Sequence, residues 1–255
     1  MASGNAEEPT ATAGDEGTSP DRSEVFRTRA AEYSFWEHTV SRERHAEALS
    51  WLPGRWGRVL DAGCASGALA LALAERAEFV DGIDESPELV ALARERAARS
   101  QVANVRFVVM PIADIPRGSY DLVTCCRVLH HLDWNALKRL RQSLSPGGRL
   151  LLLDLPASPS GRETRWTHHV ALTVGSIPRY VRRYGVRATW RIMKLRLSRP
   201  WLSHVCSDQR LSPERFDLGV REVLPGARVA MSATSMIAYW QAPQRSSGSQ
   251  DGGHA

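Results

Sequence analysis

The sequence predicts a three-layer α/β fold, in which helices cover both faces of a mostly parallel sheet and an antiparallel hairpin forms its C-terminal edge. Short apolar runs alternate with helical segments between residues 58 and 155. Parallel neighbours need a crossover between them, and these helical segments can supply it. The last two apolar runs, 228–231 and 236–241, lie too close together for a crossover, so they should pair antiparallel.

The composition predicts one globular domain between two disordered tails. The chain has 255 residues, of which 43% are hydrophobic and 24% charged, as is ordinary for a soluble protein. We place the domain at residues 23–243, because residues 1–22 and 244–255 are rich in small and polar side chains and lack a core pattern. No apolar run approaches the roughly 18 residues of a membrane-spanning helix. Since no secretory signal opens the chain, we expect a cytoplasmic location.

The elements follow one another in a regular order. A helical pattern covers residues 23–52 and precedes the alternating region. We expect strands at 58–61, 79–84, 105–110, 121–126 and 149–155, and helices that run from the glycine turn to 76, over 87–99 and over 133–144. Ser86 is the expected N-cap of the second of these helices, with Pro87 in its first turn. A further helix begins at Ser212-Pro213-Glu214 and runs to about residue 224.

The most informative segment is the turn after the first strand. Val59-Leu60-Asp61 runs into Ala62-Gly63-Cys64-Ala65-Ser66-Gly67, where a helix begins. A turn of such small residues lets a ligand approach the backbone near a helix N-terminus. A nicotinamide-binding turn would have the pattern G-x-G-x-x-G, and Ala65 stands where its second glycine belongs. The turn therefore disfavours a nicotinamide enzyme.

Four motifs in order resemble the class I S-adenosylmethionine-dependent methyltransferases, in particular their small-molecule branch (type 11) that includes the quinone-biosynthesis methyltransferases. The motifs are Asp61-Ala62-Gly63-Cys64-Ala65-Ser66-Gly67, Asp84, the segment 121–132 with Leu129-His130-His131-Leu132, and Leu144-Ser145-Pro146-Gly147-Gly148. The resemblance implies a Rossmann-like methyltransferase sheet, S-adenosyl-L-methionine as cofactor and a small molecule as methyl acceptor.

The resemblance also implies where the cofactor binds. The first motif would underlie the methionine part, through Asp61, Ala62, Gly63, Cys64 and Gly67. Asp84, followed by Glu85, would bind the ribose hydroxyls, since a carboxylate at a strand end can accept two hydrogen bonds from a vicinal diol. Asp61 would lie near the sulfonium and amino group, where a negative charge helps to hold a cation. An acid such as Asp61 can equally fix the turn by accepting backbone hydrogen bonds, and both roles stay open.

The adenine contacts depart from the family pattern. The branch usually places an acid after the third strand, and Pro111 occupies that position here. Proline has no side-chain acceptor and no backbone N–H. The adenine would then be held by Asp114, or by apolar contacts and the backbone of Ile112, next to Ala113.

The acceptor side contains candidate catalytic residues. His130 and His131 follow the fourth strand, at the edge where ligands bind in open α/β sheets. Either imidazole can take a proton from a hydroxyl, and the alternative is that the pair packs and fixes the loop. Arg127 would contact the cofactor carboxylate or an anionic substrate. Tyr33 and Trp36 belong to the aromatic side chains of the N-terminal helical region and are further substrate candidates.

A basic helical segment, about 157–206, is expected to be a lid inserted after the fifth strand. Ten Lys or Arg residues oppose one acid between Arg162 and Arg199. Arg182, Arg183 and Trp166 would then contact the substrate. The alternatives are an ordinary solvated basic face, or a helix on a membrane surface. RNA is less favoured, because the basic run is single and no nucleic-acid motif accompanies it.

The sequence therefore favours methyl transfer to a small molecule, most simply to a hydroxyl of an apolar or anionic biosynthetic intermediate of the secondary-metabolite or quinone type. Three alternatives stay open: a cofactor-binding protein with another chemistry such as cyclisation, an RNA methyltransferase, and a non-enzymatic module. No spacing of His, Cys and acidic residues is typical of a metal site, and no metal is expected. The four cysteines form no disulfide framework.

Overall fold

The structure is a computed structural model that describes residues 23–158, 165–232 and 234–244. The predicted tails therefore lie outside the described residues, apart from Gln244, as does part of the predicted lid segment.

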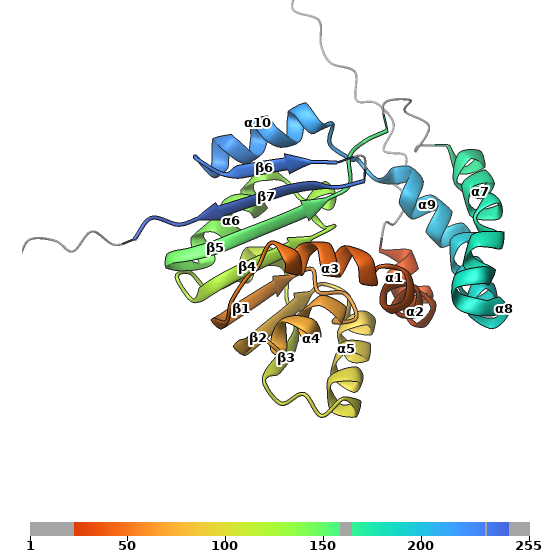
Figure 1. The fold of residues 1–255 in the computed structure, drawn as a ribbon, viewed down its shortest axis with the longest axis horizontal. Coiled ribbons are helices and arrows are strands. Elements are labelled where there is room, and N and C mark those ends of the chain that lie inside the picture. The colour runs from red at the N-terminus through yellow and green to blue at the C-terminus, as the bar shows by residue number, and fades with distance from the viewer. Residues whose placement is uncertain (1–22, 159–164, 233, 245–255) are drawn as a thin grey trace, which may run out of the picture.

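Seven strands form one sheet in the order β3-β2-β1-β4-β5-β7-β6 (Figure 1). The strands are β1 (Trp56–Ala62), β2 (Ala77–Asp84), β3 (Val105–Val109), β4 (Tyr120–Cys126), β5 (Leu144–Asp154), β6 (Arg228–Met231) and β7 (Met236–Gln241). β1 to β5 pair in parallel, and β7 pairs antiparallel with both β5 and β6. The predicted fold class is confirmed, including the reversed C-terminal hairpin. The strand order changes direction between β1 and β4, and open α/β sheets bind ligands at such a point.

Helices cover both faces of the sheet. They are α1 (Glu24–Thr28), α2 (Ala30–Val40), α3 (Arg42–Ser50), α4 (Ala68–Ala74), α5 (Pro87–Arg99), η1 (Ile112–Asp114), η2 (Leu129–His131), α6 (Trp134–Ser143), α7 (Trp166–Gly175), α8 (Ile177–Arg196), α9 (Arg199–Ser207) and α10 (Pro213–Val223). One face packs against α6 and α10, and the other against α3, α4 and α5. Alternate side chains of each strand therefore face opposite clusters, as in β1, where Leu60 belongs to one and Val59 to the other.

A third apolar cluster lies beyond the carboxyl ends of the parallel strands. It joins the N-terminal helices to the helices after β5, so that α1 and α2 contact α8 and α9 (Figure 1). Trp36 from α2 and Trp201 from α9 are both buried in it. We call α1, α2, α7, α8 and α9 the cap. No helix among the described residues is long and apolar enough to cross a membrane.

The apolar stripe of α8 differs from an ideal helical one. Gly185 has φ +78° and interrupts the helix, so the two halves of α8 do not share a single face. Tyr180 in the first half and Met193 in the second half are buried, whereas Val181 is exposed. A glycine at positive φ costs no steric strain, which explains why the break falls there.

Candidate active site

A cavity of about 690 Å3 lies where β1, β2 and β4 end, and the cap closes it from the other side. Its size is that of a small-molecule site. Several of the predicted residues line it: Tyr33, Trp36, Asp61, Gly63, Cys64, Asp84, Glu85, Ile112, Arg127, His130 and His131. Two others adjoin it in the chain, since Ala62 ends β1 and Gly67 opens α4. The structure thus brings together residues from segments that are far apart in the sequence.

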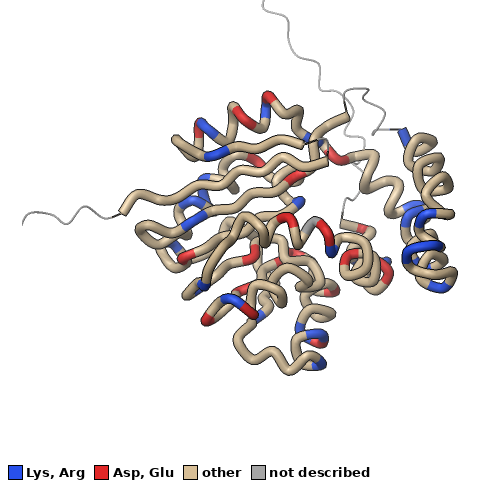
Figure 2. Tube along the Cα trace, viewed as in Figure 1, with Lys and Arg blue, Asp and Glu red and all other residues tan. Residues whose placement is uncertain are grey.

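The remaining predicted residues lie elsewhere. Ala113 and Asp114 are exposed on η1, and they are not among the cavity-lining residues. Trp166 is 61% exposed at the start of α7. Arg182 is exposed on α8, and the neighbouring Arg183 forms an ion pair with Glu43 of α3. Basic residues gather along α8 at the outer side of the cap (Figure 2). Of the predicted lid segment, Trp201, His204 and Val205 of α9 line the cavity, whereas Arg182 and Arg183 do not.

Asp84 fixes the turn that was predicted to bind the cofactor. Its Oδ2 accepts a hydrogen bond from the Ala65 backbone N–H at 2.9 Å, and its Oδ1 accepts one from the Ser86 N–H at 2.9 Å. Ala65 has φ +47°, a conformation that is unfavourable for a residue other than glycine. Burial raises the pKa of Asp84. Because a carboxylate has about four lone-pair sites, two remain to accept hydrogen bonds from a ligand in the cavity.

Gly63 lies where the backbone of the turn after β1 packs against the loop after β4. It has φ +72°, and its N–H donates to the Ile83 carbonyl oxygen at 2.9 Å. A Cβ at this position would lie 2.3 Å from Cγ2 of Val128. Only glycine satisfies both the conformation and the space.

Two buried carboxyl groups lie under the turn. Asp61 accepts a hydrogen bond from Thr124 at 2.7 Å through Oδ1, whereas its Oδ2 has no hydrogen-bond partner within the described part of the chain. Glu37 of α2 accepts hydrogen bonds from both the backbone N–H and the hydroxyl of Ser66. Burial raises the pKa of each acid to about 7. The sequence analysis missed Glu37, because its partner is 29 residues away and the helical pattern of α2 gives no sign of it.

Arg127 lies in a strained conformation at the inner end of the cavity. Its φ is +64°, and its N–H donates to the Leu153 carbonyl oxygen. The guanidinium donates to the Ser41 hydroxyl at 3.2 Å and lies over the Trp36 ring at 5.2 Å, while its Nε has no hydrogen-bond partner. Positive φ outside glycine costs of order 1–3 kcal/mol and is concentrated at functional sites. The guanidinium can therefore bind an anionic group in the cavity.

Aromatic rings form the wall that the cap contributes. Tyr33, Trp36 and Trp201 have ring centroids between 5.2 and 6.2 Å apart, and Phe26 packs edge-on against Tyr33 at 5.0 Å. Burial, followed by the charge of Glu37, raises the pKa of Tyr33, so its hydroxyl keeps its proton. Such a wall suits an apolar or aromatic ligand with few polar groups.

His130 is oriented by an acid that the sequence analysis did not name. Its Nδ1 lies 2.7 Å from Asp154 Oδ1 at the end of β5, and its backbone N–H donates to Asp154 Oδ2 at 2.8 Å. Asp154 Oδ1 also accepts from the Leu155 N–H, so this carboxylate acts as an acceptor throughout. We assign the proton of His130 to Nδ1 on this network, which leaves the lone pair of Nε2 free.

Asp208, just after α9, faces the same imidazoles. His130 Nε2 lies 3.8 Å from its Oδ2, and His131 Nδ1 lies 3.9 Å from its Oδ1. Burial, followed by the neighbouring His130, lowers the pKa of His131 to about 3, so its ring is neutral. Asp208 comes from the cap and follows no periodic pattern, which is why no sequence signal identified it.

Comparisons with known proteins match part of the chain to methyltransferases. Residues 59–148 match the family model described as a methyltransferase domain. A ubiquinone biosynthesis O-methyltransferase of Acinetobacter baylyi is 29% identical over 153 residues, which cover 54% of this chain and 64% of that protein. One of Xanthomonas campestris pv. campestris is 41% identical over 114 residues, which cover 43% of this chain and 46% of that protein. The chain thus spans less than two thirds of the length of these curated relatives.

Solved structures show the same fold. The N-methyltransferase NodS of Bradyrhizobium japonicum, in complex with S-adenosyl-L-homocysteine, has a TM-score of 0.56 at 18% identity, over 88% of this chain and 99% of that chain. A SAM-dependent methyltransferase of Aquifex aeolicus has a TM-score of 0.53 at 14% identity, over 87% of this chain and 98% of that chain. At these identities the likeness concerns the fold.

Proposed function

We propose that this chain, which is a class I S-adenosylmethionine-dependent methyltransferase in sequence and fold, binds S-adenosyl-L-methionine in the cavity and methylates a hydroxyl oxygen of a small molecule. One observation carries the proposal: a single cavity joins the turn at Gly63 and Asp84 to an aromatic wall and to His130. A cofactor site and an acceptor site that share one cavity are what direct methyl transfer requires, because the two reacting groups must meet in line.

The residues at the strand ends fit the cofactor. The free acceptor sites of Asp84 suit a ribose diol, and the unpartnered Oδ2 of Asp61 suits a cationic amino or sulfonium group. Ile112 lies in the cavity wall and offers apolar contact to a purine. This contact would take over the role of the family's usual acid, whose position Pro111 occupies here. When bound, the cofactor supplies a methyl group that its positive sulfur already activates.

The cap and the loop after β4 fit the acceptor. The rings of Tyr33, Trp36 and Trp201 favour an apolar, ring-containing acceptor, and Arg127 favours one with an anionic group. S-adenosylmethionine, held by Asp61 and Asp84, would supply the methyl group that replaces the proton on the acceptor oxygen. The hydroxyl proton passes to His130 Nε2, and Asp154 holds the imidazole in the tautomer that can accept it. The names of the relatives, which are O-methyltransferases, support oxygen as the methylated atom.

The proposal predicts that hydroxylated aromatic acids are methylated and that Asp154→Asn slows the reaction. The assay supplies S-adenosylmethionine with a labelled methyl group and a panel of phenols and catechols, and mass spectrometry finds a product one methyl group heavier. We expect Asp154→Asn to lower kcat by about 10²–10⁴-fold while S-adenosylhomocysteine binds as before. Asp217→Asn, on the exposed face of α10, is the matched control. Release of label without a methylated acceptor would contradict the proposal.

The raised pKa values of the two buried acids predict how stability and the affinity for S-adenosylmethionine depend on pH. The pKa of Glu37 rises from 4.5 to about 7 and that of Asp61 from 3.8 to about 7, so the empty native protein binds more protons than the unfolded chain within that window. The contribution of these two acids to stability should therefore fall as the pH rises from about 4 to about 7. His131 and His38 act in the opposite sense, because burial lowers their pKa values to about 3 and about 4. A cationic ligand favours the ionised acids, so the affinity for S-adenosylmethionine should rise through pH 7.

The measurement is the ratio of the affinities for S-adenosylmethionine and S-adenosylhomocysteine at about pH 6 and about pH 8. The second ligand lacks the sulfonium charge and serves as the control for every other contact. We expect the ratio to increase with pH in the native protein and to stay flat in Asp61→Asn. A flat ratio in the native protein would show that Asp61 does not face the sulfonium.

A further inference from the structure

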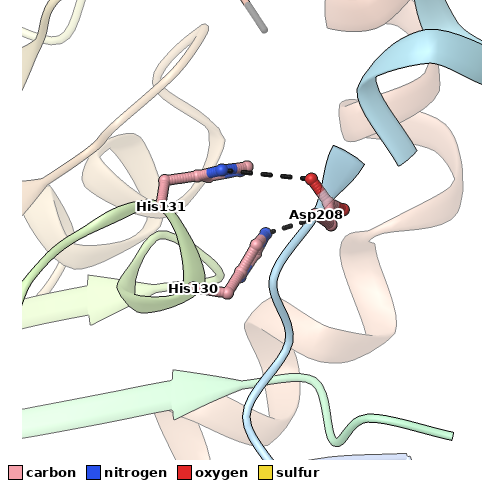
Figure 3. Close-up of side chains that lie close together, drawn as sticks. All are labelled: His130, His131 and Asp208. Atoms are coloured by element: carbon pink, nitrogen blue, oxygen red, sulfur yellow. Dashed lines mark ion pairs between the residues drawn. The ribbon is translucent and has the colours of Figure 1, made fainter. Parts of the chain in front are cut away.

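Three side chains converge in the cavity beside the predicted acceptor position. His130 and His131 come from η2 after β4, and Asp208 comes from the chain after α9 (Figure 3). Their ligand atoms all lie within 4.8 Å of one another. His204 of α9 adds a fourth, with Nε2 3.8 Å from Asp208 Oδ1. The cluster therefore joins the catalytic edge of the sheet to the cap.

The carboxylate of Asp208 is buried, and one of its oxygens has no hydrogen-bond partner among the residues that the structure describes. Its side chain is 5% exposed, and its Oδ1 has no hydrogen-bond partner. The nitrogens of the three imidazoles lie 3.8 or 3.9 Å away, and Arg210 Nη2 lies 3.7 Å from Oδ2. These separations are too long for hydrogen bonds. A buried charge with no such bond costs free energy, and a cation shared by the surrounding atoms removes that cost.

The distances between the imidazole nitrogens and the carboxylate oxygens of Asp208 are close to the distance between two ligands of one metal ion. Zinc binds imidazole nitrogen and carboxylate oxygen at about 2.0–2.2 Å, so two ligands of one tetrahedral ion lie about 3.4 Å apart. The observed 3.8 and 3.9 Å lie just above this value. A closure of about half an ångström would bring each imidazole to this distance from the carboxylate. The three ligand atoms lie within 4.8 Å of one another, so the two imidazoles must also approach each other.

The orientation of His130 is that of a metal ligand. Imidazoles that bind metals almost always donate their other N–H to a carboxylate or carbonyl. Asp154 accepts from His130 Nδ1 at 2.7 Å, which directs Nε2 toward Asp208. Two imidazoles and one carboxylate, open to a cavity, are a donor set for Zn²⁺, Fe²⁺, Co²⁺ or Mn²⁺, whereas Mg²⁺ prefers oxygen donors.

We propose that His130, His131 and Asp208 bind one divalent transition-metal ion in this cavity. Arg210 is the competing cation, since it approaches the same Asp208 Oδ2 as His130 Nε2, whereas His131 and His204 face Oδ1. A role in the reaction rests on the proposed function: an acceptor hydroxyl that coordinates the ion has a lower pKa and releases its proton to water, so that the ion replaces the free imidazole as the activating group. The binding of the ion does not depend on that role.

The test uses the full-length protein without an affinity tag, treated with EDTA and desalted. Calorimetric titration with Zn²⁺, and the visible absorption of added Co²⁺, report binding and its coordination, with Mg²⁺ as the comparison ion. Asp208→Asn and His131→Gln remove one ligand each. Their matched controls are Asp217→Asn on α10 and His168→Gln on α7, which lie outside the cavity. S-adenosylhomocysteine is titrated in parallel into every variant.

We expect one equivalent of Zn²⁺ in the native protein and an affinity at least about a hundredfold lower in each ligand variant, since the loss of a second-shell partner alone costs 10–100-fold. The two control variants should bind as the native protein does. No binding of Zn²⁺ or Co²⁺, or unchanged binding in both ligand variants, would overturn the proposal. If the protein binds S-adenosylhomocysteine but no metal, the cation site fails and the proposed function stands. If it binds the metal but neither cofactor form, the proposed function fails and the cation site stands.

Discussion

Gly63→Ala should abolish cofactor binding and lower the free energy of unfolding by about 2–4 kcal/mol. The added Cβ would lie 2.3 Å from Cγ2 and 3.0 Å from Cγ1 of Val128. Val128 is β-branched and its χ1 is restricted, so the loop after β4 must move and the cavity wall changes with it. The positive φ of +72° adds strain of its own. Urea unfolding and calorimetric titration with S-adenosylhomocysteine measure the two effects.

Two glycines serve as controls for this prediction. Gly118 has φ +62° but nothing within 4 Å of an added Cβ, so Gly118→Ala isolates the conformational cost of about 1 kcal/mol. Gly175 has open space and no positive φ, so Gly175→Ala should be close to neutral. If Gly63→Ala were as stable as Gly118→Ala and bound the cofactor normally, the close approach of Gly63 to Val128 would be contradicted.

Asp84→Ala is expected to weaken the binding of S-adenosylmethionine and S-adenosylhomocysteine by at least about a hundredfold. Two hydrogen bonds to a charged acceptor contribute about 1.5–3 kcal/mol each, and 1.4 kcal/mol corresponds to a factor of ten. The substitution also removes the acceptor for the Ala65 and Ser86 N–H groups. Calorimetry gives the affinity, and thermal unfolding shows whether the fold survives.

Asp84→Asn separates these two causes. Asparagine can still accept through one oxygen, so one of the two bonds that hold the turn persists, but it cannot accept both bonds of a diol in the same way. We expect Asp84→Asn to unfold near the native temperature and still to bind weakly. Affinity that is normal in Asp84→Asn and lost in Asp84→Ala would assign this residue to turn geometry alone.

The fold could be predicted because its signals are local. Strand and helix alternation fixed the parallel part of the sheet, and the short gap between residues 231 and 236 required an antiparallel hairpin. Ser86 caps α5 as expected, with its hydroxyl accepting from the Leu89 N–H. Most boundaries moved by one or two residues, as for β1, which runs from Trp56 to Ala62. The exception is β5, which begins at Leu144, five residues before the expected start at 149.

The residues of the candidate site could be predicted only where they lie together in a short segment of the sequence. The turn at residues 61–67 and Asp84 lie in consecutive units of the sheet, whereas Glu37, Asp154 and Asp208 reach the cavity from distant segments. Asp154 could have been found, because it ends a parallel strand next to β4 and such ends meet at one edge. Asp208 could not, because its position depends on how α9 packs against α1.

Helical periodicity alone does not determine which side of the basic segment faces the rest of the protein. Spacing groups Arg182 and Arg183 on one side of α8, but it does not say which side meets the rest of the protein. The structure places the apolar contacts of α8 against α2 and leaves Trp190 64% exposed on the outside. Tertiary packing decides this orientation, and so it decides that the aromatic rings of α2 and α9, rather than these two arginines, line the cavity.

Calorimetric titration of the native protein with S-adenosylmethionine, S-adenosylhomocysteine and NADH tests the central claim most directly. We expect one equivalent of each of the first two ligands to bind per chain with micromolar affinity, because Asp61, Gly63 and Asp84 line a cavity of suitable size, and we expect no binding of NADH. Binding of NADH, or of none of the three, would mean that this cavity is not a site for the methyl donor.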